Sequence, residues 1–350
     1  MNNTPQRPGA LGRVAKLLGL VLGLSAIAGQ GLAAENTGPV ASTFPSPLGR
    51  FLLVAGEGLY VVEPDGTPSW SYHPAPPGQP GYDDIIYDGW PLPDGHYLFS
   101  TTRYVREIDR DQRTLWEYRV KAPTEVKCGV PLPNGNVAAL NSQEQAILEL
   151  EAGTGRVLRR TPLPAQGDDH TRYMLMRRTP EGNYLVALRA EERFVEVTPE
   201  GKVVHSFSTP AGEVVHKFKL PCMPVMAQRL ADGTTLGTGF FGLVRLDADW
   251  KLSWWFTHAD AAPHFPLLFT WGVTELPDHR LVVANSDWHS PQAGVNRVQL
   301  FAVDAEKRIS WVLPATAYQP WKRSEVEPAT GFTEHRTNIV QLLGPAVDAK

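Results

Sequence analysis

Short apolar runs alternate with compact polar turns along the chain from residue 48 onward. Six of these turns are related in sequence and position: Leu48-Gly49, Pro93-Asp94-Gly95, Pro133-Asn134-Gly135, Pro180-Glu181-Gly182, Ala231-Asp232-Gly233 and Pro277-Asp278-His279. Successive turns are 46, 40, 47, 51 and 46 residues apart. Each interval has room for four short strands, and a repeat of this kind is typical of a β-propeller blade.

The second repeat predicts an inner strand over 85–92, a second strand over 97–101, a third over 105–109 and an outer strand over 114–118. The first repeat lacks an inner strand, and a matching segment appears at the C-terminus over 338–344. Pairing these two ends would remove the open sheet edges that invite aggregation. We therefore expect an all-β, six-bladed propeller of four-stranded blades over 48–350, closed by a C-terminal strand that completes blade one.

The N-terminal segment predicts export. Arg7, Arg13 and Lys16 precede an apolar stretch over 17–28, and small residues follow it, as in a signal peptide. We expect residues 1–34 to be the signal peptide and 35–47 a polar lead-in, with the protein periplasmic or secreted. Cleavage lowers the formal net charge from −4 by three, to −7, which argues against a nucleic-acid partner. The apolar stretch is too short for a membrane span.

The second repeat reads Leu-Pro-Asp-Gly over 92–95, Val-Arg-Glu-Ile-Asp over 105–109 and Leu-Trp-Glu-Tyr over 115–118. This succession resembles the PQQ-like and arylsulfotransferase-like bacterial propellers across nearly all of the chain that follows the N-terminal segment. An arylsulfotransferase-like activity would imply a histidine that accepts the sulfuryl group, with arginine or asparagine stabilising its charge. The tryptophan docking motif of the larger PQQ enzymes is missing, so the sequence does not support PQQ as a cofactor.

Polar chemistry is predicted on one face of the propeller. The connections between blades and the turns between second and third strands share this face, and they are longer and more varied than the glycine turns opposite. Seven of the ten histidines fall there: His73, His170, His216, His258, His264, His289 and His335. Two interpretations remain open, namely solvated surface loops and a polar ring at the mouth of the channel that binds a ligand.

His170 and Arg172 are the first candidates for catalysis, because residues two apart share one face of a strand. Asp168 or Asp169 is expected to orient the imidazole. His335 and Arg336 form a second candidate pair on the closing strand. The candidate ligand-binding residues on the same face are Asp84, Lys127, Asp169, His264, Trp271 and His289.

Sulfur-containing residues gather near three inner strands, and the candidates for metal binding are Cys128, Met174, Met176, Cys222 and Met226. Thiolate and thioether ligands suit a soft metal such as Cu(I), whereas methionine also fills gaps in ordinary cores. A disulfide between Cys128 and Cys222 is a further alternative, although blades three and five are not neighbours.

Three functions remain open from the sequence. The first is an exported propeller that binds a small molecule at the channel mouth, with or without a divalent metal, and acts on it as a transferase or hydrolase. The second is a non-enzymatic scaffold for a periplasmic protein partner, and the third is a copper-handling protein. The sequence does not identify the substrate or the oligomeric state.

Overall fold

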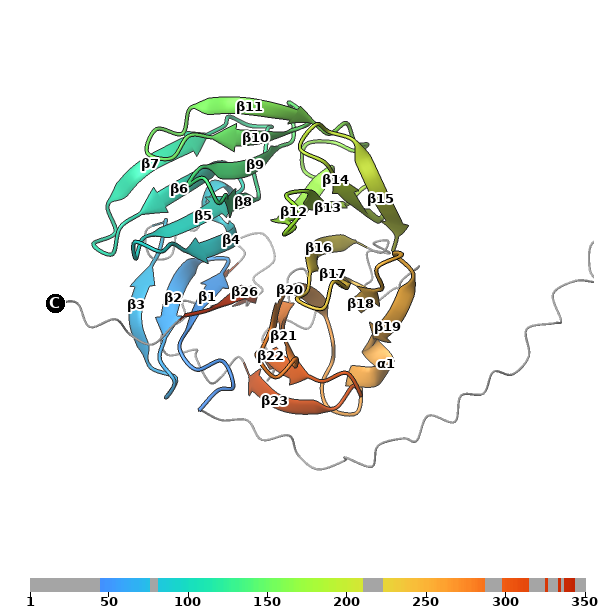
Figure 1. Ribbon diagram of the computed structural model, residues 1–350. Helices are drawn as coiled ribbons and strands as arrows, with labels where there is room; N and C mark the ends of the chain where they lie inside the picture. Colours follow the sequence, from blue (N-terminus) through green and yellow to red (C-terminus); the bar gives the residue numbers. More distant parts are fainter. Residues whose placement is uncertain are drawn as a thin grey trace, which may run out of the picture. The chain divides into compact units, whose positions relative to one another are not determined.

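The computed structural model describes residues 45–75, 81–209, 223–286, 298–314 and 337–343, together with two short strands at 325–326 and 333–334. These residues belong to the unit Thr37–Lys350. Six four-stranded antiparallel sheets follow one another in a ring, as the sequence predicted (Figure 1). The protein is a six-bladed β-propeller.

Each blade is numbered from the channel outward. Blade one contains β26 (Thr337–Leu342), β1 (Phe51–Ala55), β2 (Gly58–Val62) and β3 (Pro68–Tyr72). Blade two contains β4 (Ile86–Pro91), β5 (Tyr97–Thr101), β6 (Tyr104–Ile108) and β7 (Thr114–Arg119). Blade three contains β8 (Gly129–Pro131), β9 (Val137–Asn141), β10 (Ala146–Leu150) and β11 (Val157–Pro162).

Blade four contains β12 (Tyr173–Arg178), β13 (Tyr184–Leu188), β14 (Arg193–Val197) and β15 (Val203–Ser208). Blade five contains β16 (Pro224–Arg229), β17 (Thr235–Gly239), β18 (Gly242–Leu246) and β19 (Leu252–Phe256). Blade six contains β20 (Phe269–Glu275), β21 (Leu281–Ser286), β22 (Val298–Val303) and β23 (Ile309–Pro314). Three short elements lie between blades: η1 (Tyr82–Asp84), α1 (His258–Ala261) and the paired strands β24 (Glu325–Val326) and β25 (Thr333–Glu334).

Burial changes from the second to the outer strand of a blade. Every residue of β1, β5, β9, β13 and β17 is buried, because these strands are packed on both faces by neighbouring blades. At least half of the residues in each of the outer strands β7, β11 and β15 are exposed. Four tryptophans, Trp70, Trp116, Trp254 and Trp311, lie on outer strands.

The C-terminal strand closes the ring as predicted. β26 pairs antiparallel with β1, with Phe51 opposite Leu342, and it also contacts β20 of blade six and β4 of blade two. The Asn338 amide donates to the carbonyl of Ile86 at 2.6 Å, so the closing strand is also fixed to the next blade. Asn338 therefore has a structural task.

Four inner strands bulge near the end at which the chain enters them. The register with the second strand shifts between Ile86 and Asp88 in β4, and equivalent shifts occur early in β12, β16 and β20. A bulge re-aims the side chains beside it. Tyr87 and Trp271, which lie beside two of these bulges, pack together with ring centroids 5.6 Å apart across blade one.

Among the residues that the structure describes, no helix has the length and hydrophobicity needed to span a membrane.

Candidate functional site

Three blade connections bring four polar side chains together on the face predicted from the sequence. Tyr82 comes from η1 before β4, Glu125 and Lys127 from the extended segment before β8, and His170 from the turn before β12. We call these four residues the His170 cluster. The segment that carries Glu125 is held between blades two and three, because Val126 donates its amide to Thr102 and Ser142 donates its amide to Glu125.

Glu125 is the centre of the cluster. Its carboxylate accepts hydrogen bonds from Tyr82 Oη at 2.7 Å and from Lys127 Nζ at 2.7 Å, and it lies 3.3 Å from His170 Nδ1. Its side chain is 5% exposed. Burial alone would raise the pKa of Glu125, but the bonds from His170, Lys127 and Tyr82 lower it to about 2. The carboxylate is therefore ionised at neutral pH.

The His170 imidazole is turned by these contacts so that one nitrogen faces Glu125 and Tyr82. Nδ1 lies 2.9 Å from Tyr82 Oη, and the side chain is 35% exposed. Nε2 makes no hydrogen bond with any other described residue. A carboxylate at Nδ1 fixes the tautomer that leaves the lone pair on Nε2, which is the arrangement of a general base.

Lys127 is almost fully buried beside the carboxylate, with 3% of its side chain exposed. Burial lowers the pKa of Lys127 to about 8, although the Glu125 carboxylate favours its charged form. Lys127 Nζ also donates to the backbone carbonyl of His170, and it lies 5.7 Å from the centre of the Tyr87 ring. The turn that carries His170 is thus fixed by the same group that pairs with Glu125.

A second cation meets the same carbonyl. Arg189, in the turn after β13, places Nη1 3.4 Å from the His170 carbonyl and Nε 2.9 Å from the Met223 sulfur. Burial lowers the pKa of Arg189. No described carboxylate forms an ion pair with Arg189, although the charges of Glu125 and Asp168 both favour its charged form.

A buried ion pair lies on the inner strands that follow the His170 cluster. Arg177 on β12 makes two bonds to the fully buried Asp88 on β4, at 2.7 and 3.0 Å, and so bridges blades two and four across blade three. The Cys128 thiol donates to Asp88 at 3.5 Å. Burial opposes the charge on Asp88 and raises its pKa, while Arg177 acts in the opposite direction.

The predicted catalytic pair His170 and Arg172 is not brought together as expected. Both residues precede β12, so the two-residue period of a strand does not apply to them. Arg172 donates to the carbonyls of Ser142, Ala165 and Gly167 and so fixes the loop. The prediction that Asp168 or Asp169 orients the imidazole is also wrong, because Glu125 and Tyr82 occupy that position.

The predicted ligand-binding residues are dispersed. Lys127 is in the His170 cluster, and Asp169 lies beside it, accepting from Ser142 at 2.8 Å. Asp84 accepts from the Tyr104 hydroxyl, Trp271 is buried against Phe269 and Tyr87, and His264 is exposed after α1. The remaining candidates His289, His335, Arg336 and Cys222 lie outside the described residues.

Sequence reasoning missed Glu125 and Tyr82. Neither residue belongs to a motif, and 43 positions separate them along the chain. The sequence did contain one indication of Glu125. It lies two positions before Lys127, in a segment expected to enter the channel. An alternation of opposite charges in a buried segment indicates a paired network.

The sulfur residues are packed in the core. Met174, Met176 and Met226 are buried, and Cys128 is a free thiol that accepts from the Met176 amide at 3.2 Å. Burial raises the pKa of Cys128 well above its ordinary value, which favours the protonated thiol over a thiolate ligand. The soft-metal site remains a prediction.

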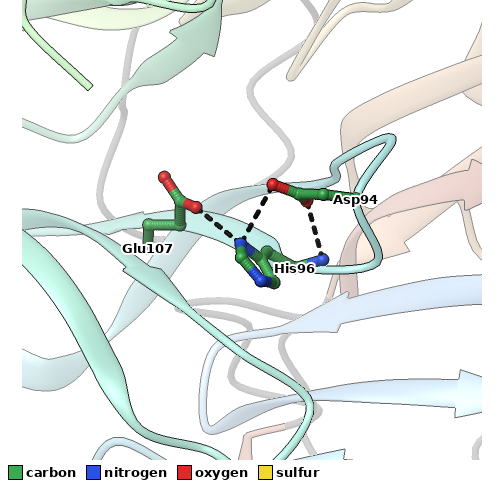
Figure 2. A group of neighbouring side chains, drawn as sticks. All are labelled: Asp94, His96 and Glu107. Carbon is green, nitrogen blue, oxygen red and sulfur yellow. Dashed lines mark hydrogen bonds and ion pairs between the residues drawn. The ribbon is translucent and has the colours of Figure 1, made fainter. Parts of the chain in front are cut away.

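One group in the described part of the chain has metal-ligand geometry: Asp94, His96 and Glu107 in blade two (Figure 2). His96 Nδ1 lies 3.1 Å from Asp94 Oδ2 and 2.9 Å from Glu107 Oε1. The other oxygen of Glu107 accepts from the Trp116 indole. Blades three and four repeat the bond with amides, Asn136 to Glu149 at 2.7 Å and Asn183 to Glu196 at 2.8 Å. The group therefore has the contacts of a structural link that joins the turn to the third strand of the blade; we call it the turn lock.

Comparisons with known proteins establish the fold. A scan against protein-family models and a search of curated protein sequences found no match. Among solved structures, a protein of unknown function from Bacteroides caccae is similar with a TM-score of 0.66 and 22% identity, over 83% of this chain and 98% of that one. A streptogramin B lyase is similar with a TM-score of 0.53 and 14% identity, over 79% of this chain and 83% of that one.

A catalytically inactive histidine-to-alanine variant of virginiamycin B lyase from Staphylococcus aureus, with quinupristin, has a TM-score of 0.53 and 13% identity. That match covers 82% of this chain and 90% of the lyase. At these identities the likeness concerns the fold alone, and this chain shares the β-propeller fold of those proteins.

Proposed function

We propose that the protein binds a small molecule on the face of the propeller where the blades connect, and acts on it by acid–base chemistry at His170. The observation that carries the proposal is the bond between Nδ1 of His170 and the buried, ionised Glu125. Nε2 then removes a proton from the bound molecule, and Glu125 stabilises the imidazolium that results.

The surroundings of His170 suggest the class of molecule. Lys127 and Arg189 both approach the His170 carbonyl; Lys127 pairs with Glu125, whereas Arg189 forms no ion pair with a described carboxylate. Arg189 therefore retains donors for an anionic group of a ligand. Tyr82, which is 45% exposed, offers an aromatic surface beside it.

The fold neighbours indicate a reaction class to test first. Two of them are lyases, and in one of these a single histidine-to-alanine change gives a catalytically inactive protein. Elimination needs a base that removes a proton, which is the task assigned here to Nε2 of His170. The alternative function for the same site is a binding protein without turnover.

The test is an untargeted screen. The purified protein is incubated with a small-molecule extract, and mass spectrometry follows which compounds disappear and which appear. We expect turnover with the wild type and its loss in His170→Ala and Glu125→Gln. His205→Ala, which removes a histidine stacked on Trp250 in blade four, is the matched control. Turnover that survives in folded His170→Ala protein would overturn the proposal.

The proposal includes export. The basic residues, apolar stretch and small residues within 1–34 support a signal peptide that is removed. N-terminal sequencing of protein isolated from the cell envelope and medium should begin near residue 35. Recovery of full-length protein from the cytoplasm alone would contradict this part.

A further inference from the structure

A hollow lies between blades five and six, on the face of the short turns and away from the His170 cluster. It has a volume of about 220 Å³ and is lined by Arg245, Ser253, Trp254, His279, Leu281, Asp304 and Ala305. The Asp304 carboxylate is already paired with Arg308 at 2.7 Å. Its walls come from β18, β19, the β20–β21 turn, the start of β21 and the β22–β23 turn. A hollow of this size accommodates a small ring compound.

The crevice between blades one and two has the same framework. Trp70 on β3 donates its indole N–H to the carbonyl of Arg110 at 2.9 Å, and Trp254 on β19 donates in the same way to Ala305 at 2.9 Å. Arg110 and Ala305 both follow the aspartate that opens the turn after the third strand. The two indoles are therefore equivalent and equally anchored.

What covers the indole differs between the two crevices. The Tyr97 ring is stacked on Trp70, with centroids 4.3 Å apart and planes 21° from parallel. Tyr97 is the first residue of β5, and the first residue of β21 is Leu281. In blade six a leucine replaces the tyrosine and an alanine replaces Arg110, so the space over Trp254 is left open.

The hollow also has a cation that the repeat does not predict. Blades two, three and four carry a glutamate at the fourth position of the third strand, namely Glu107, Glu149 and Glu196, and blade five carries Arg245. Its Nε is buried and has no hydrogen-bond partner among the described residues, and its Nη1 lies 3.5 Å from Asp232. The guanidinium therefore retains donors for a carboxylate.

We propose that this hollow binds a small aromatic acid. The ring stacks on Trp254 where the Tyr97 ring stacks on Trp70, and the carboxylate pairs with Arg245. The site is separate from the His170 cluster and does not depend on the function proposed for it. Three differences from the crevice between blades one and two create it together: Leu281 in place of Tyr97, Ala305 in place of Arg110 and Arg245 in place of Val61.

Titration calorimetry with phenylacetate tests the site, with indole fluorescence as a second readout. The wild type should bind one equivalent, and the isosteric neutral phenylacetamide should bind at least ten-fold more weakly. Leu281→Tyr, which restores the residue of blade two, should fill the hollow and weaken phenylacetate binding at least ten-fold without lowering the melting temperature. His170→Ala should leave the affinity unchanged.

The matched control opens the other crevice. The double variant Tyr97→Leu, Arg110→Ala removes the side chains that cover Trp70. We expect it to bind a second molecule of phenylacetate, more weakly than the first. This second site should bind phenylacetamide equally well, because Val61 occupies the position of Arg245. Absence of wild-type binding at millimolar phenylacetate, or undiminished binding by folded Leu281→Tyr protein, would sink the proposal. Equal affinity for acid and amide would overturn the role of Arg245.

Discussion

Two histidine–glutamate pairs lie on opposite faces of this propeller. His96 and Glu107 join a turn to a strand within one blade, at 2.9 Å, whereas His170 and Glu125 come from two different blade connections, at 3.3 Å. In the first pair, the neighbouring blades perform the same task with asparagine. In the second, a buried lysine and a tyrosine also converge on the carboxylate.

The difference teaches how to separate structure from function in a repeat protein. A contact that recurs in several blades with altered side chains serves the fold, since the repeat preserves its geometry while its chemistry varies. A contact assembled from loops of unequal length is not required by the repeat. The His170 cluster is of the second kind.

The largest expected effect comes from making the same substitution in both pairs. His170→Asn removes the base and should lower turnover by about 10²–10⁴-fold, the usual contribution of a positioned acid or base. His96→Asn introduces the residue that blades three and four carry at the equivalent position, and it should leave turnover unchanged. Turnover rates measured on both variants test this difference. Equal losses of turnover would contradict a catalytic role for His170 and a purely structural role for His96.

Removing the buried cation should cost the most stability. Lys127→Met leaves the Glu125 carboxylate buried with fewer partners, and breaking a buried pair in this way typically costs about 3–5 kcal/mol. Urea unfolding measures the loss. Adding Glu125→Gln to Lys127→Met should recover part of it, and failure to recover any would show that Lys127 acts through packing instead.

Acid should weaken the wild type through Glu125. Its pKa is about 2 in the folded protein against an ordinary 4.5, so the carboxylate stabilises the fold above pH 4.5 and that contribution disappears as the pH falls toward 2. The loss is about 3 kcal/mol over this range. Unfolding free energies measured against pH should fall less steeply for Glu125→Gln, and parallel curves would contradict the assignment.

The smallest expected effect is on the stability of the turn lock. His96→Asn exchanges one hydrogen bond to Glu107 for another of the type seen in blade three, so the unfolding free energy should change by less than about 1 kcal/mol. Thermal melts with and without added Zn²⁺ check both the lock and the metal alternative. A melting temperature that Zn²⁺ raises in the wild type but not in His96→Asn would favour a metal site at Asp94, His96 and Glu107.

The architecture could be predicted because it depends on features repeated every 40 to 51 residues. Turn glycines and alternating apolar strands are local signals, and the unpaired strand at each end of the repeat indicated closure through β26. The face of the site was predictable for the same reason, since topology assigns every connection to one end of the blades.

The partners within the site could not be predicted. Three irregular blade connections bring together Tyr82, Glu125 and His170. The spacing of these residues along the chain follows no repeat. Arg172 was misassigned because its loop turns before β12 begins, and its guanidinium satisfies three carbonyls there. The hollow over Trp254 depends on side-chain volume at Leu281, which the pattern of apolar residues does not distinguish from Tyr97.

The pairing of β26 with β1 sets the timing of folding. Phe51 and Leu342 are nearly the whole domain apart in sequence, so blade one cannot be completed until the last strand has been synthesised. Closing so long a loop makes ring closure a late and entropically costly step. A chain truncated before residue 337 would lack β26 and so leave β1 and β4 exposed along the channel. Proteases would therefore be expected to degrade truncated chains in preference to complete ones.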